Sequence, residues 1–142
     1  MNRVPLAERC PILVVDDDAD VVTLARKVLE HAGWLVEATT DPRHALEIAT
    51  RVKPCLVLVD LMMPHMDGEE LLCALRAAFR GDAMPKIALI SAAYSRAEVA
   101  KRLEVDASLA KPFDLDDLRD VAVRFASAHR DRPTSRPPPP SR

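Results

Sequence analysis

The chain has 142 residues, of which 49% are hydrophobic, and its 20 Lys and Arg residues against 22 Asp and Glu residues give a formal net charge of −2. This length suits one domain with a core of its own, and the charge balance disfavours direct binding to nucleic acid. Apolar runs such as Cys55 to Val59 are near five residues long, far short of the roughly 20 that span a bilayer. We therefore expect a cytoplasmic protein without membrane contact.

Short apolar segments alternate with segments of helical period from residue 11 onward. The first predicted strand, Pro11 to Val15, precedes a helix whose buried face is predicted to contain Val21, Leu24, Ala25, Val28 and Leu29. The other predicted strands are Leu35 to Thr39, Leu56 to Asp60, Lys86 to Ser91 and Ser108 to Ala110. The first, third and fourth strands are apolar enough for burial on both faces.

Helix-start signals separate these strands. Asp41 stands before a proline, Asp67 stands before Gly-Glu-Glu, and Ser95 lies three residues before Glu98 in the spacing of a capping box. A second helical pattern runs from Leu115 to Phe125. The alternation predicts an α/β fold of (βα)5 type, with a parallel sheet covered by helices on both faces.

Composition changes near the end of the chain. Residues 129–142 read HRDRPTSRPPPPSR, which predicts a disordered Pro/Arg-rich tail after a folded domain over residues 10–128.

The three cysteines, Cys10, Cys55 and Cys73, are scattered without a Cys-x-x-Cys pair. We expect buried, reduced thiols without a metal or redox role.

Polar side chains follow four of the predicted strands. Asp16 and Asp17 end the first strand, Asp60 ends the third, Ser91 ends the fourth and Lys111 follows the fifth. The carboxyl ends of parallel strands meet at one edge of a sheet, where ligands bind. Asp18 and Asp20 have a simpler interpretation as acids at a helix start.

Converging carboxylates repel one another, and a divalent cation relieves that repulsion. Mg²⁺ prefers one or two carboxylates together with waters and phosphate oxygens. Lys111 and Ser91 add the cation and the hydroxyl that phosphoryl oxygens need. The residues thus predict a phosphoryl-transfer site, and the lack of a Gly-rich loop argues against a bound nucleotide.

Four motifs resemble the receiver domain of response regulators in two-component signalling, over residues 11 to about 127. They are ILVVDD (Ile12 to Asp17), LVLVDLMMPHMDG (Leu56 to Gly68), IALISA (Ile87 to Ala92) and LAKPF (Leu109 to Phe113). The resemblance implies a doubly wound, flavodoxin-like fold of strand order 2-1-3-4-5, similar to chemotaxis regulators. It also implies a phosphoprotein that signals by protein–protein interaction and catalyses only its own phosphorylation and dephosphorylation.

The resemblance assigns roles to the residues at the strand ends. Asp60 is then the phospho-acceptor, served by a histidine kinase or a histidine phosphotransfer protein. Asp17, Asp60 and the backbone carbonyl of Met62 bind Mg²⁺ directly, and Asp16 acts mainly through a coordinated water. The family's lysine and hydroxyl fall on Lys111, which pairs with the phosphoryl group, and on Ser91, which bonds to it and moves inward on phosphorylation.

Three further positions compare with the family pattern. Pro112 matches the proline that follows a cis peptide bond. His65 stands where glycine is common, and Ser108 replaces the Tyr or Phe that acts as a switch in most members. This second departure argues against signal transmission through an aromatic side chain at residue 108, and Tyr94, three residues after Ser91, is the alternative aromatic residue.

Two other functions compete with this interpretation. A hydrolase of the haloacid-dehalogenase type needs a second acid two residues after the nucleophile, where this chain has Met62. A receiver-like docking module that works without phosphorylation usually lacks one of the acids or the lysine, all of which are present here. Within the favoured function, the chain is a freely diffusing regulator, a phosphorelay intermediate or one domain of a longer protein.

Overall fold

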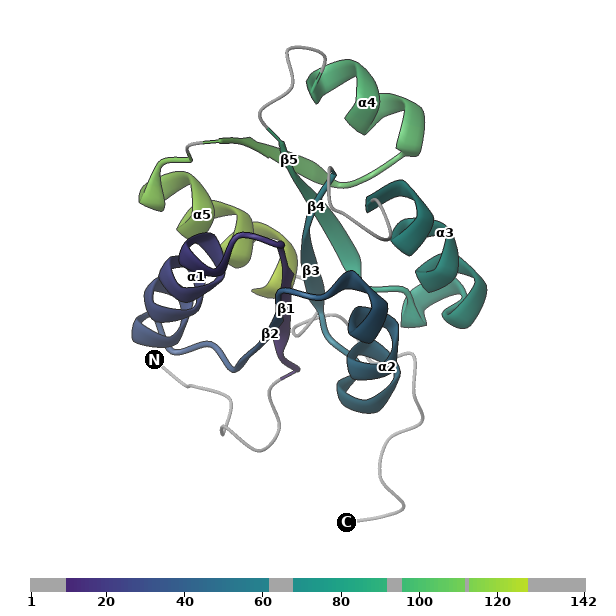
Figure 1. Ribbon diagram of the computed structural model, residues 1–142, viewed down its shortest axis with the longest axis horizontal. Coiled ribbons are helices and arrows are strands. Elements are labelled where there is room, and N and C mark those ends of the chain that lie inside the picture. Colours follow the sequence, from purple (N-terminus) through teal and green to yellow (C-terminus); the bar gives the residue numbers. More distant parts are fainter. Residues whose placement is uncertain (1–9, 62–67, 92–95, 112, 128–142) are drawn as a thin grey trace.

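Five short strands form one parallel sheet in the order β2-β1-β3-β4-β5 (Figure 1). The computed structural model describes residues 10–61, 68–91, 96–111 and 113–127. The strands are β1 (Ile12–Val15), β2 (Val36–Thr39), β3 (Leu56–Asp60), β4 (Lys86–Ser91) and β5 (Ala107–Ala110). All five predicted strands and their order are confirmed, with the ends displaced by one residue at most.

Burial follows the hydropathy of each strand. Every residue of β1 and β3 is buried, and so is every residue of β4 except Lys86. Helices on both faces of the sheet leave these central strands no solvent-facing side, so their sequences are continuous apolar runs rather than alternating ones. The predicted burial of the first, third and fourth strands on both faces is confirmed.

The helices form two layers, one on each face of the sheet (Figure 1). They are α1 (Ala19–His31), α2 (Pro42–Val52), α3 (Gly68–Ala78), α4 (Arg96–Leu103) and α5 (Leu115–Val121), with a 3-10 turn η2 (Gly81–Ala83) before β4 and a π-helical segment η3 (Ala122–Ser127) after α5. One core lies between the sheet and α1 with α5, and the other lies against α2, α3 and the end of α4.

Aspartates cap three of these helices. Asp18, Asp41 and Asp114 each accept a hydrogen bond from the backbone N–H two residues further on, which satisfies a donor that the first turn leaves free. The predicted helix start at Asp41 and the capping interpretation of Asp18 are confirmed. Asp67 and Ser95 lie outside the described residues.

The buried face of α1 differs from the predicted one. Val22 is buried with Ala25, Val28 and Leu29, whereas Leu24 is 44% exposed. Two interleaved apolar rows occupy this helix, and periodicity alone cannot decide which row faces the sheet. Leu24 instead lines a surface cavity.

The cysteines are not three buried thiols, so that prediction is wrong. Cys10 and Cys55 form a disulfide, with their Cα atoms 5.5 Å apart, and Cys73 is exposed on α3. Cys10 lies two residues before β1 and Cys55 directly before β3. Because β1 and β3 are parallel neighbours, their starting residues lie side by side.

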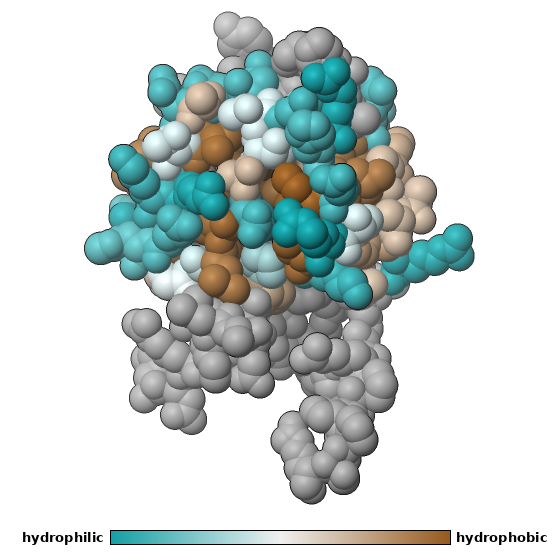
Figure 2. Space-filling view, turned by 60° about the horizontal axis from the view of Figure 1, so that its bottom comes forward, coloured by the Kyte–Doolittle hydropathy of each residue, from teal (hydrophilic) through white to brown (hydrophobic). Residues whose placement is uncertain are grey.

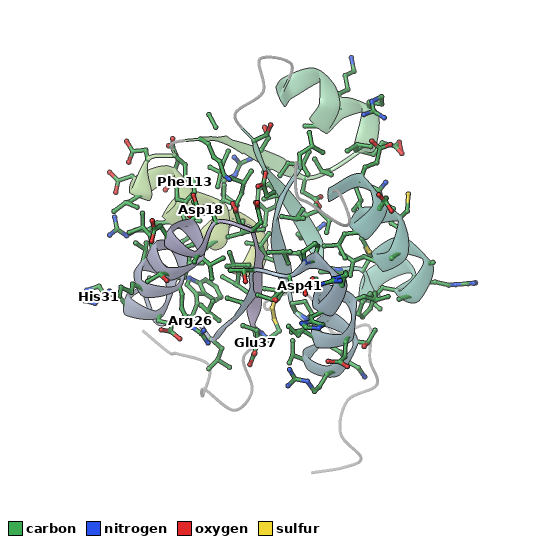
Figure 3. The ribbon with its side chains drawn as sticks, viewed as in Figure 1. Asp18, Arg26, His31, Glu37, Asp41 and Phe113 are labelled. Atoms are coloured by element: carbon green, nitrogen blue, oxygen red, sulfur yellow. A yellow bond between two sulfur atoms is a disulfide. The ribbon has the colours of Figure 1, made fainter. Side chains whose placement is uncertain are left out.

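Strand β2 forms one edge of the sheet, and α1 covers part of that edge. The carbonyls of Leu35 and Thr39 accept hydrogen bonds from β1 and the residue after it, so the carbonyl of Val36 points away from the sheet. The Arg26 guanidinium of α1 donates to this outward carbonyl at 3.2 Å and also pairs with Glu30. Figure 3 labels Arg26 and, on β2, Glu37.

Hydrophilic and hydrophobic side chains are intermixed on the described part of the face that Figure 2 displays. Such mixing is usual for a folded protein surface. Among the described residues, no helix combines the length and the apolar composition needed to cross a bilayer.

Candidate phosphoryl-transfer site

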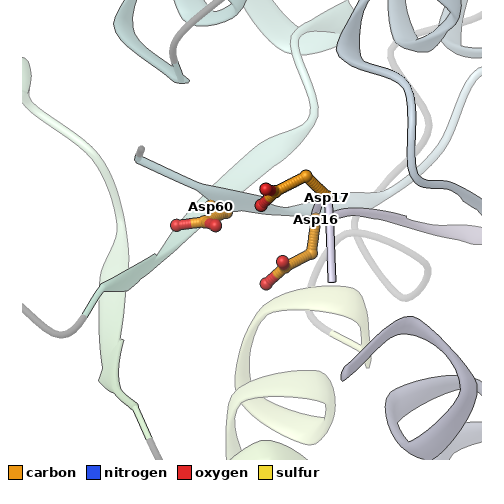
Figure 4. Close-up of side chains that lie close together, drawn as sticks. All are labelled: Asp16, Asp17 and Asp60. Carbon is orange, nitrogen blue, oxygen red and sulfur yellow. The ribbon is translucent and has the colours of Figure 1, made fainter. Parts of the chain in front are cut away.

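Three carboxylates gather where β1 and β3 end (Figure 4). Asp16, Asp17 and Asp60 each offer a carboxylate oxygen, and these oxygens lie within 4.8 Å of one another. The register of the two strands pairs Val15 with Val59, so Asp16 and Asp60, which follow them, lie next to each other. Asp16 is 0% exposed and Asp60 is 5% exposed, whereas Asp17 faces solvent.

Lys111 joins the two buried carboxylates. Its Nζ lies 2.8 Å from Asp16 Oδ2 and 3.1 Å from Asp60 Oδ2. Burial by itself would lower the pKa of this ammonium, but its contacts with Asp16 and Asp60 outweigh burial, so the pKa is raised. Lys111 therefore remains a fixed positive charge beside the carboxylates.

Ser91 ends β4 at the same edge and is 3% exposed. Its backbone carbonyl accepts a hydrogen bond from the Lys111 N–H at 3.1 Å, and Ala110 is its register partner on β5. The five residues predicted from the strand ends are thus brought to one edge of the sheet by the ladder itself.

Gly68 belongs to this region, although the sequence interpretation gave it no role beyond a helix start. Its N–H donates to the Leu61 carbonyl at 2.8 Å, which brings the start of α3 against the end of β3. A Cβ at this position would lie 2.6 Å from the Asp60 carbonyl oxygen, well inside contact distance. The signal was present in the motif Leu56 to Gly68, whose last residue is this glycine.

A cavity of 330 Å³ adjoins the lysine. Its lining consists of Asp18, Val21 and Leu24 of the α1 region together with Lys111 and Phe113, and Figure 3 labels Asp18 and Phe113. Leu24 is exposed because its side chain borders this cavity.

The donor set suits a hard divalent cation. Three carboxylates and one ammonium leave the cluster of Asp16, Asp17, Asp60 and Lys111 with two negative charges. Asp16 Oδ2 is buried, and the Lys111 ammonium that contacts it at 2.8 Å also serves Asp60. Buried charge of this kind is costly without further compensation. Oxygen ligands and unbalanced negative charge fit Mg²⁺.

Several predicted features lie outside the described residues: the carbonyl of Met62, His65, Tyr94 and the peptide bond before Pro112. Ser108 lies on β5 at an intermediate level of burial.

Comparison with known proteins gives a consistent result. Residues 12–123 match the family described as the response regulator receiver domain. The chain is 39% identical to the response regulator MprA of Mycolicibacterium vanbaalenii over 75% of this chain and 46% of MprA, so it spans about half of that protein. It is 32% identical to sporulation initiation phosphotransferase F of Bacillus subtilis, over 80% of this chain and 91% of the relative.

A solved structure agrees with these relatives. The signal receiver domain of a response regulator from Bermanella marisrubri is 31% identical and superposes with a TM-score of 0.72, covering 82% of this chain and 98% of that one. The fold and its acidic edge define a signalling module of the two-component type. The chain belongs to the response regulator receiver domain family.

Receiver domains are signalling modules that interact with kinases or phosphotransfer proteins and with downstream effectors. Membership explains why the predicted sheet, strand order and acidic cluster occur together in one chain.

Proposed function

We propose that this domain takes a phosphoryl group from a histidine kinase or a histidine phosphotransfer protein onto Asp60, with Mg²⁺ as cofactor, and signals through protein–protein contacts in the cytoplasm. One observation carries the proposal: Asp16, Asp17 and Asp60 lie together while Lys111 contacts two of them. A cluster of this charge and composition suits phosphoryl transfer to a carboxylate.

Asp60 is the acceptor in this scheme. Its carboxylate oxygen attacks phosphorus, a P–O bond forms and the P–N bond of the donor phosphohistidine breaks. The electron pair of the broken bond returns to the imidazole nitrogen, which takes up a proton. Since Asp60 ends a strand held by both β1 and β4, its carboxylate is positioned before the donor arrives.

Asp16, Asp17, Asp60 and the backbone carbonyl of Met62 would hold the cation, with Asp16 acting mainly through a water. Bound Mg²⁺ neutralises negative charge that grows on the phosphoryl oxygens during transfer. These ligand assignments rest on the resemblance and on the carboxylate cluster.

Lys111 and Ser91 complete the site. The Lys111 ammonium contacts Asp60 Oδ2 at 3.1 Å, so it lies beside the oxygen to which phosphorus is transferred and can turn toward the phosphoryl oxygens. Ser91 lies at the end of the adjacent strand and supplies a hydroxyl as a second donor.

A phosphorylation-independent docking module is the second candidate, and Ser108 is the observation that favours it. Without an aromatic side chain at this position, the usual route from the hydroxyl residue to the output face is missing. The retained acids and lysine favour the function that depends on phosphorylation.

Intact-mass measurement after incubation with acetyl phosphate and Mg²⁺ tests the proposal. We expect one phosphoryl adduct on the wild-type chain, none on Asp60→Ala, and none on the wild type when a chelator removes divalent cations. Asp106→Ala is a matched control at the opposite edge of the sheet and should be phosphorylated. An adduct of equal yield on Asp60→Ala would place the acceptor elsewhere, and no adduct on any variant would favour the docking module.

A further inference from the structure

We propose that Cys10 and Cys55 form a reversible oxidation site that fastens the start of β1 to the start of β3. This site is separate from the phosphoryl-transfer site. Cys55 lies five residues before Asp60 along β3, which at strand spacing is about 16 Å. The disulfide therefore acts on the two strands that carry the acidic cluster without touching the cluster itself.

The backbone brings the two cysteines together even before a bond forms. The Cys55 N–H donates to the Pro11 carbonyl at 2.8 Å, and the Cys55 carbonyl accepts from the Lys86 N–H at 2.8 Å. These bonds fix Cys55 between the starts of β1 and β4. The Cα separation of 5.5 Å lies in the range that a disulfide requires, so no rearrangement of the strands is needed for oxidation or reduction.

Exposure differs between the two sulfur-bearing residues. Cys55 is 0% exposed within the core beneath α1 and α5, whereas Cys10 is only partly buried at the margin of that core. A small thiol or disulfide in solution therefore reaches Cys10 first. An apolar environment disfavours a thiolate at Cys55, so exchange at this pair is slow in the native state and proceeds through Cys10.

The chemistry balances with a low-molecular-weight disulfide such as oxidised glutathione as the oxidant. The Cys10 thiolate attacks that disulfide, a mixed disulfide forms at Cys10 and one glutathione thiol leaves. Cys55 then attacks the Cys10 sulfur, the protein disulfide forms and the second glutathione thiol leaves. Two protein thiols are oxidised, and their two protons and two electrons end on two glutathione molecules.

Reversibility follows from the compartment together with the geometry. The proposed function places the chain in the reducing cytoplasm, where disulfides in proteins are typically transient or redox-sensing. Paired cysteines in such a chain are thiols at rest and become bonded when the thiol pool is oxidised. Reversibility rests on the proposed function, whereas pairing itself rests only on the geometry of the two strand starts.

Oxidation changes the stability of the domain. The bond spans a sequence separation of 45 residues, from Cys10 to Cys55, so it removes much conformational freedom from the unfolded chain. For a domain of this size we expect the melting temperature of the oxidised form to exceed that of the reduced form by roughly 10 °C.

The test uses the full chain carrying Cys73→Ser, which removes the exposed third thiol. The protein is equilibrated in glutathione buffers of increasing oxidised fraction, approached from the reduced and from the oxidised side. Acid quenching, unfolding and maleimide labelling then count the free thiols by intact mass. We expect two labels in reducing buffer, none in oxidising buffer and the same midpoint from both directions.

Thermal unfolding of the same samples gives a second readout. The difference of roughly 10 °C between the two forms should vanish in Cys10→Ser, a change at a partly exposed position that the fold tolerates better than one at Cys55. The single variant Cys10→Ser, which keeps Cys73, is the control for the exposed thiol.

Three results would overturn the proposal. Two labels at every buffer ratio would mean that the thiols do not pair, and no labels at every ratio would mean a permanent bond. A stable glutathione adduct as the end product would mean that Cys55 does not resolve it. None of these readouts uses Asp60, so failure here is distinguishable from failure of phosphorylation.

Discussion

The two edges of the sheet differ in how the charges of their acidic side chains are compensated, and the acids at the amino-terminal edge are exposed whereas two at the other edge are buried. At the amino-terminal edge, Asp106 accepts a hydrogen bond from the Ile87 N–H at 2.8 Å and lies 3.9 Å from the Lys86 ammonium. At the carboxyl-terminal edge, Asp16 is fully buried and shares the single Lys111 ammonium with Asp60. One edge has its charges satisfied, and the other keeps negative charge in excess.

The same strands run through both edges, so the difference is local. Strand β3 begins beside a disulfide and ends at Asp60, with apolar residues between them. The core stabilises the fold, which allows the carboxyl-terminal edge to keep clustered carboxylates that repel one another.

Crowding of the backbone at the carboxyl-terminal edge gives the largest expected effect on stability. In Gly68→Ala the new Cβ would meet the Asp60 carbonyl oxygen and the Leu61 Cα, so we expect a loss of about 2 kcal/mol in the free energy of unfolding. Helix propensity alone would make the same change stabilising. Chemical denaturation measures the sign, and phosphorylation of Asp60 should slow as its backbone shifts.

The control for this variant lies near the other edge. Gly81 has a φ of +56° and nothing within 4 Å of an added Cβ, so Gly81→Ala costs only the backbone strain of about 1 kcal/mol. Equal stability of Gly68→Ala and wild type would show that the backbone at the end of β3 shifts to accommodate the added methyl group. Steric crowding would then not distinguish the two edges.

Cation binding should stabilise only the acidic edge. At a Mg²⁺ concentration ten times the dissociation constant, binding to the native state adds about 1.4 kcal/mol, which thermal unfolding detects as a rise in melting temperature. Asp17→Asn removes one of the three repelling carboxylates. We expect this variant to melt higher than wild type without Mg²⁺ and to respond less when Mg²⁺ is added.

Asp20→Asn is the matched control, because Asp20 lies in the first turn of α1 but outside the cluster. It changes the net charge equally and should retain the wild-type response to Mg²⁺. If Asp17→Asn responds as fully as Asp20→Asn, the acidic edge does not bind the cation through Asp17.

The smallest expected effect is a pH dependence of stability that arises at the start of α2, where the acid Asp41 is paired with Arg43. A side-chain hydrogen bond from Arg43, with a backbone hydrogen bond from the same residue, lowers the pKa of Asp41 from 3.8 to about 2. A carboxyl whose pKa is lower in the folded state stabilises the fold above its unfolded pKa. That contribution is present above 3.8 and is lost as the pH falls toward 2.

Titration by NMR measures this pKa directly. Arg43→Ala should bring the pKa of Asp41 back toward its ordinary value and weaken the loss of stability between these pH values. An unchanged pKa in Arg43→Ala would assign the shift to another cause. Because Asp41 is partly exposed and its partner Arg43 is exposed, salt should reduce the effect.

The sequence predicted the strands and the acidic edge because both depend on local patterns. Apolar runs of four to six residues fixed β1, β3 and β4, and Asp16 with Asp60 follow from where those runs end. In a parallel sheet the strand ends share one edge, so convergence of these residues needed no knowledge of side-chain packing.

The errors arose where position depends on packing between elements. Val22 and Leu24 lie in adjacent apolar rows of α1, and only contact with the sheet determines that Val22 is the buried one. The Cys10–Cys55 pair required two facts together, namely that each cysteine precedes a strand and that those strands are neighbours. The role of Gly68 required the approach of α3 to β3 in space.

The contact between Arg26 and the Val36 carbonyl bears on how the protein behaves at high concentration. An outer strand exposes backbone groups on which a strand of another molecule can grow. Here a side chain of the same chain already uses the Val36 carbonyl, and β2 offers only four residues, Glu37 among them. A second sheet would have to displace a guanidinium and bury a carboxylate to add itself, so this side of the molecule opposes edge-to-edge aggregation.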